Sequence, residues 1–246
     1  MASELLVVVL LIFLLAGTVK GVIGLGLPTV SLAALTVVVE LPAAVALMVI
    51  PSAMTNIWQA LDGGHFAELV RRFWLMLLAS AVGVWFSYGF LLVANPKAMT
   101  ALLGVVLCVY AATSLRRPRT TPWPAHERFV SPAVGLATGA LAGATGSLVM
   151  PMVAYLQGLN LERDTLVQMM GISFAVTTCT IGLAIVEHGS YDGQLVLLSI
   201  AALVPAILGM KLGILLRRRL SERVFRNALF IGLFTIGIRL IWKGVG

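Results

Sequence analysis

Long apolar segments follow one another along almost the whole chain and are separated only by short polar loops. Hydrophobic residues make up 60% of the 246 residues and charged residues 11%, against about 45–50% and about 25% in soluble domains. Apolar runs of this length are typical of membrane-spanning helices, which satisfy their backbone hydrogen bonds internally. The sequence therefore predicts an all-α, polytopic membrane protein.

One of these segments is interrupted where a membrane helix should continue, at VKGVIGLGLPTV (residues 19–30). Gly21, Gly24 and Gly26 weaken a helix, and Pro28 removes a backbone donor and clashes with the preceding turn. An unpaired backbone group is costly in hydrocarbon, so a break of this kind survives only where it is buried in protein or lines a cavity. The stretch is a candidate site.

The interrupted segment recurs in the second half of the chain. GTVKGVIGLGLP (residues 17–28) and GALAGATGSLVMP (residues 139–151) both read G-x3-G-x2-G followed by a proline. The apolar segments and polar breaks that follow have the same order in both halves, at an offset of about 122–126 residues. This shared order predicts an internal duplication. The expected parts are a first membrane repeat (1–115), a basic cytoplasmic linker (116–128) and a second membrane repeat (129–246).

The length of the first element in each half predicts how the repeats are oriented. Residues 5–39 and 129–160 would each form roughly 50 Å of helix, against a hydrocarbon core of about 30 Å. A hairpin that turns at the glycines fits better than one tilted helix. Each repeat would then be a glycine-broken helical hairpin plus three transmembrane helices. Since the hairpin returns the chain to its starting side and three crossings follow, the second repeat is expected to be inverted.

The distribution of charge favours the same topology. With both termini outside, the basic loops at Arg71/Arg72, 116–128 and 217–226 all face the cytoplasm, and the acidic loop 187–192 faces out. Single crossings at 5–39 and 129–160 would instead place the loops 116–128 and 217–226 on opposite sides. The net charge of +7 is therefore interpreted as a topology signal and not as a nucleic-acid surface.

The duplicated pattern of a glycine-rich broken segment ending in proline, an alanine-rich helix and a Gly-x3-Gly helix resembles the TauE/SafE family of sulfite exporters and organosulfonate permeases. The resemblance runs from about residue 5 to residue 243. It implies a multi-pass carrier of the bacterial inner membrane that moves small sulfur-containing anions. Its substrate would bind at the midplane between the two breaks, with alternating access. GVIGLGLP keeps two glycines of the family's G-I-G-G-G stretch and GATGSLVMP departs further, which leaves the particular anion open.

The physics of the breaks also suits an anion. Helices that restart after a break direct free N–H groups and a positive dipole end at the cavity. Lys20 is the basic residue at the first break, and its counterpart is Ala142; snorkelling of Lys20 to an interface is the alternative. For the polar residues in the helices, hydrogen bonds between helices are the alternative. The expected substrate-binding residues are Lys20, Gly24, Gly26, Asn56, Gln59, Thr145, Gly146, Ser147, Ser173 and Thr177.

Other functions have weaker support in the sequence. An intramembrane enzyme needs a base or a metal, and no His or acid is placed to activate Ser147 or Cys179. Neither a metal nor a cofactor is expected, and the expected partners are the anion and the lipid bilayer, with a homodimer left open. No acidic residue falls in the middle of an expected span, so the coupling ion and the direction of transport cannot be read. An anion channel and a carrier for small carboxylates are the alternatives.

Overall fold

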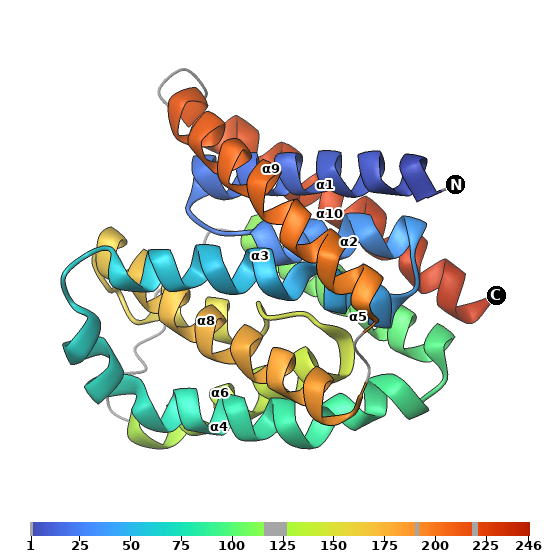
Figure 1. Cartoon of the computed structure of the whole chain (residues 1–246). Coiled ribbons are helices and arrows are strands. Elements are labelled where there is room, and N and C mark those ends of the chain that lie inside the picture. The colour runs from blue at the N-terminus through green and yellow to red at the C-terminus, as the bar shows by residue number, and fades with distance from the viewer. Residues whose placement is uncertain (1, 116–126, 190–191, 218–220) are drawn as a thin grey trace.

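The computed structural model describes residues 2–115, 127–189, 192–217 and 221–246, and these residues form ten helices and no strand (Figure 1). The first half holds α1 (Ala2–Ile23), α2 (Leu27–Val38), α3 (Leu41–Leu61), α4 (Phe66–Val93) and α5 (Pro96–Leu115). The second half holds α6 (Glu127–Thr145), α7 (Met152–Gly158), α8 (Arg163–Glu187), α9 (Gly193–Arg217) and α10 (Glu222–Val245). The predicted all-α class is confirmed; most of the basic linker, residues 116–126, lies outside the described residues.

Seven of the described helices are long and apolar enough to cross a membrane, namely α1, α3, α4, α5, α8, α9 and α10. The predicted polytopic membrane protein is therefore confirmed. In each half a pair of helices separated by a glycine break precedes three long helices. Both termini lie at the same end of the bundle (Figure 1).

The first break is a turn between α1 and α2. Gly24 (φ 88°) and Gly26 (φ 111°) occupy a backbone region that side chains disfavour, and Pro28 occupies the first turn of α2. The chain then runs back along α1 (Figure 1). The residue types that interrupt the apolar run are thus the ones that the reversal requires.

The second break is a longer turn between α6 and α7. Gly146 has φ 75°. The Met152 N–H donates to Thr138 Oγ1 (3.1 Å), and the hydroxyls of Ser131 and Tyr155 share a hydrogen bond of 2.6 Å. Because Ser131 lies near the start of α6 and Tyr155 lies on α7, these bonds hold α7 back along α6.

Glycines bring pairs of helices into close contact. A Cβ at Gly17 would lie 2.2 Å from the Ala206 carbonyl oxygen, where α1 packs along α9. A Cβ at Gly139 would lie 2.0 Å from the Ser80 carbonyl oxygen, where α6 packs along α4. Backbone approach this close is what small-x3-small pairs provide. These glycines therefore serve the close packing of the helices.

Equivalent positions in the two halves have exchanged partners. A Cβ at Gly24 would meet Val167 at 3.5 Å, and a Cβ at Gly146 would meet Val45 at 2.6 Å. Gly146 follows Gly24 by 122 residues, and Val167 follows Val45 by the same 122. Each glycine turn therefore packs against the opposite half of the chain, at positions with the same offset.

Candidate functional site around Lys20

Lys20 lies in the last turn of α1 and is buried, with 3% of its surface exposed. Its Nζ donates hydrogen bonds to Thr55 Oγ1 (3.2 Å) and to Asn56 Oδ1, both on α3. No ion pair of Lys20 is recorded in the part of the chain that the structure describes. A basic group is thus held inside the helix bundle by neutral oxygens alone.

These partners place the Lys20 amine beside the last third of α3, opposite the middle of α8. The two helices run antiparallel, since a Cβ at Gly171 would lie 2.8 Å from the Ala60 nitrogen and one at Gly182 would lie 3.2 Å from Val49 Cγ1. Thr55 lies midway between Val49 and Ala60 and therefore opposite the middle of α8. The amine is consequently bonded inside the helix bundle, on the part of α3 that leads to Asp62.

Several buried polar atoms in the middle of α3 and α8 have no hydrogen-bond partner among the described residues. They are Ser52 Oγ, Asn56 Nδ2, Ser173 Oγ and Thr178 Oγ1. Because Asn56 Oδ1 accepts from Lys20, its amide nitrogen is left to donate elsewhere. Buried polar groups are normally paired, so unpaired donors near a cation suit a ligand that accepts hydrogen bonds.

A cavity of about 290 Å³ adjoins this group; we call it the Lys20 cavity. Lys20, Gly24, Thr55 and Gln59 line it, and Asp62 and Arg217 line it where α3 and α9 end. The cavity therefore connects the buried amine with one end of the bundle, where an arginine and an aspartate flank the opening. It can admit a small solute to Lys20.

The structure brings four of the predicted site residues together: Lys20 and Asn56 are bonded, and Gly24 and Gln59 line the same cavity. The Gln59 side chain donates to the Val167 carbonyl oxygen (2.7 Å) and so ties α3 to α8. Gly26 is not among the residues that line this cavity. A Cβ there would meet Val19 Cγ1 at 3.3 Å inside the turn.

The residues of the second break form a separate group. Thr145 Oγ1 donates to the Leu141 carbonyl oxygen (2.6 Å) and accepts from the Ser147 N–H (3.3 Å), while Ser147 Oγ is buried without a partner. Gly146 lies against Val45 near the start of α3, whereas Gly24 lies against Val167 near the start of α8. Since α3 and α8 are antiparallel, the two breaks lie toward opposite ends of the pair, with the Lys20 amine between them.

The backbone N–H groups of the two central glycines are already used. Gly24 N–H donates to the Lys20 carbonyl oxygen and Gly146 N–H to the Ala142 carbonyl oxygen, both at 2.7 Å. These two N–H groups are therefore not available to the backbone cradle expected from the sequence. Thr177 points elsewhere as well, because its hydroxyl donates to the Ser173 carbonyl oxygen (2.8 Å) and bonds Ser80 Oγ on α4 (2.9 Å).

Sequence reasoning missed two kinds of contribution to this region. Trp58 and Arg217 line the Lys20 cavity. In the sequence Arg217 is the first of three consecutive arginines, which are interpreted only as a topology signal. Gln168 binds the loop before α4, accepting from His65 N–H (3.0 Å) and donating to the Ala60 carbonyl oxygen (2.9 Å). No local pattern distinguishes these residues from their neighbours.

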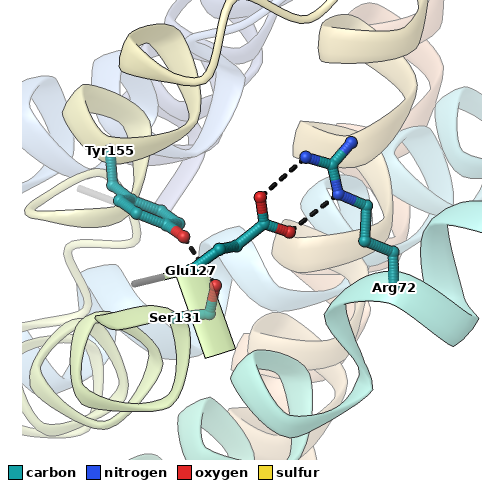
Figure 2. Close-up of polar contacts among 4 residues, drawn as sticks. All are labelled: Arg72, Glu127, Ser131 and Tyr155. Atoms are coloured by element: carbon teal, nitrogen blue, oxygen red, sulfur yellow. Dashed lines mark hydrogen bonds and ion pairs between the residues drawn. The ribbon is translucent and has the colours of Figure 1, made fainter. Parts of the chain in front are cut away.

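A second polar cluster joins the starts of α4 and α6. Figure 2 shows Arg72 donating to both carboxylate oxygens of Glu127, each at 2.7 Å, beside the Ser131–Tyr155 bond. The adjoining cavity, about 520 Å³, is larger than the Lys20 cavity. However, the guanidinium is already neutralised by a carboxylate that would repel an anion. This cluster is therefore a structural clamp between α4 and α6.

Comparison with known proteins adds the family. The family model described as "Sulfite exporter TauE/SafE" matches residues 9–240, which is nearly the whole chain. No curated protein and no solved structure gave a match. With its all-helical membrane fold and its duplicated glycine breaks, the chain belongs to the TauE/SafE family of sulfite exporters.

Proposed function

We propose that this membrane transporter is a carrier for small sulfur-containing anions of the sulfite and sulfonate class and that it binds them at Lys20. The observation that carries the proposal is the buried amine, which has neutral partners only and borders a cavity of about 290 Å³. A buried charge without a counter-charge is costly, and a bound anion would offset that cost. Membership of a sulfite exporter family points to the same class of substrate.

In the proposed complex the ammonium of Lys20 faces the anion. Asn56 Oδ1 holds the ammonium in place by accepting a hydrogen bond from it. The free Asn56 Nδ2 donates to one anion oxygen, and the unpartnered hydroxyls of Ser52 and Ser173 are the nearest neutral donors along α3 and α8. Hydroxyl and amide donors bind the oxygens of a sulfonate or sulfite without adding charge. Thr55 also holds the ammonium of Lys20, because its oxygen accepts a hydrogen bond from Lys20 while its hydroxyl donates to the Pro51 carbonyl oxygen.

Inverted repeats with alternating access are part of the proposal. The exchanged contacts of Gly24 with Val167 and of Gly146 with Val45 support a two-fold relation between the halves. The antiparallel course of α3 and α8, which are equivalent helices, supports an axis that lies across the bundle. With one break toward each end of the pair, each hairpin could open the central amine to one side of the membrane.

The proposed orientation has both termini outside the cytoplasm in the inner membrane. It predicts that Glu68→Cys, in the first turn of α4, is labelled only from the cytoplasm, and that Gln194→Cys, in the first turn of α9, is labelled only from outside. Both side chains are exposed. The background would replace the two free cysteines, Cys108 and Cys179, by alanine. Labelling of both variants by an impermeant maleimide from the same side would contradict the orientation.

The binding proposal is tested with the purified protein and a panel of sulfite, taurine, sulfoacetate, acetate and lactate. Lys20→Met removes the charge and keeps the length, and we expect it to weaken binding of the preferred anion by about tenfold or more, or about 1.4 kcal/mol per decade. Lys211→Met, which removes an exposed cation from α9, should leave the affinity unchanged. Equal affinities of wild type and Lys20→Met would remove Lys20 from the site.

Transport in proteoliposomes then separates the alternatives. A carrier exchanges substrate in trans, so an excess of unlabelled sulfite inside should accelerate the entry of labelled sulfite, and the flux should saturate. A channel would show neither property. Preference for acetate and lactate over sulfite, taurine and sulfoacetate would favour the carboxylate carrier.

A further inference from the structure

A second, smaller cavity lies on the other side of the first break. Its volume is about 140 Å³, and it forms where the turn after α1 meets the end of α5 and the starts of α8 and α10. Two arginines line it, Arg163 and Arg226, together with the polar side chains of Tyr110, Ser114 and Gln157. No acidic residue lines it in the part of the chain that the structure describes. We call it the Arg226 cavity.

Arg226 has hydrogen-bonding capacity that the protein does not use. Its Nε is buried and has no partner among the described residues. A guanidinium presents its N–H groups in a planar fork that matches the oxygens of an oxyanion. A buried, unsatisfied guanidinium donor in a cavity without carboxylates is the arrangement that an anion would complete.

The Arg226 cavity adjoins the Lys20 cavity. Val167 lines both, while Gly24 lines the Lys20 cavity and its neighbours Ile23 and Leu25 line the Arg226 cavity. The segment 23–25 is therefore the partition between them. This partition is the glycine turn itself, whose backbone is held by the bond from Gly24 N–H to the Lys20 carbonyl oxygen.

We propose that the Arg226 cavity is a second binding site for small oxyanions, separated from the Lys20 site by the turn at 23–25. The inference rests on the proposed function, since it assumes that the protein carries anions of this class. The cavity is smaller than the roughly 300–1,000 Å³ of sites for drug-sized ligands, so it selects a compact anion. Because the turn at 23–25 separates the two cavities, an anion bound in the Arg226 cavity reaches Lys20 when this turn moves.

The test is equilibrium binding of radiolabelled sulfite and radiolabelled taurine to the purified full-length protein in nanodiscs. Wild type should bind two equivalents of at least one of these probes. Arg226→Gln should bind one equivalent, at the Lys20 site. Lys20→Met should also bind one equivalent, in the Arg226 cavity. Arg226→Lys keeps the charge without the fork and should retain the second equivalent with an affinity reduced by about tenfold. Arg223→Gln removes an exposed arginine one turn earlier on α10 and should bind like wild type.

The outcomes are distinguishable. One equivalent in wild type that only Lys20→Met removes would overturn the second site and leave the proposed function standing. Two equivalents that persist in Arg226→Gln would also overturn it. Failure of wild type to bind either probe would overturn the second site together with the proposed function.

Discussion

The two broken hairpins share their backbone design and differ in their chemistry. In both, a glycine with positive φ donates its N–H to the carbonyl oxygen four residues earlier, from Gly24 to Lys20 and from Gly146 to Ala142, at 2.7 Å in each case. The carbonyl belongs to a lysine in the first hairpin and to a fully buried alanine in the second. The two turns share this backbone bond, but among the described residues only the first has a buried cation at this position.

The hairpins also differ in how their second helices are held. α2 has 12 residues, whereas α7 has only 7 and is tied to α6 through Ser131–Tyr155 and Thr138–Met152 hydrogen bonds. The first hairpin thus carries the buried Lys20, whereas the second is anchored through hydroxyl hydrogen bonds, a division between the two hairpins. The following predictions test that division.

The largest effect is expected from crowding either turn. Gly26→Val and Gly146→Val place a β-branched side chain at φ 111° and φ 75°, beside Val19 and Val45 respectively. Each should reduce anion transport in proteoliposomes to background while the protein still inserts into membranes. Gly64→Val is the control, because Gly64 has φ 79° but nothing lies within 4 Å of its Cβ position. Transport at the wild-type rate in either turn variant would show that the turn is not part of the pathway.

A carboxylate introduced at equivalent positions should act differently in the two halves. Thr178 follows Asn56 by 122 residues, and both are fully buried. Asn56→Asp places a carboxylate beside Lys20, where it takes the position of the anion, so anion affinity should fall by about tenfold or more while thermal stability is kept. Thr178→Asp buries a carboxylate away from the lysine's bonded partners and should lower thermal stability. Equal behaviour of the two variants in binding and in thermal melting would contradict the asymmetry.

A smaller effect, equal in both halves, is expected at the helix contacts. Gly17→Ala and Gly139→Ala each push a Cβ into a carbonyl oxygen, at 2.2 Å and 2.0 Å. Overpacking of this kind costs about 1–3 kcal/mol, which lowers the melting temperature by roughly 2–4 °C per kcal/mol in a protein of this size. Gly232→Ala, with nothing within 4 Å of its Cβ position, should melt like wild type. Destabilisation by only one of the two contact variants would argue against equivalent packing in the repeats.

The helices and their breaks could be predicted from the sequence because they depend on local properties. Apolar length predicts the spans, and glycine and proline predict the turns at Gly24 and Gly146, because these residues change the backbone whatever surrounds them. The site could be predicted only in part. Lys20 and Asn56 were both expected in it, but their hydrogen bond depends on how α1 and α3 pack. Thr177 was also expected in the site, but its hydroxyl bonds Ser80 Oγ on α4 instead.

By itself the sequence determined an all-α membrane protein with two glycine-rich breaks, because composition and glycine spacing act along the chain. The tertiary structure decided which polar atoms meet. It used the backbone N–H groups of Gly24 and Gly146 within the chain, brought the Lys20 amine to Thr55 and Asn56 on α3, and placed Arg217 in the lining of the Lys20 cavity. The physical reason is that burial and pairing in the bundle interior depend on the packing of helices that are distant in sequence. A pattern read along one helix does not contain that information.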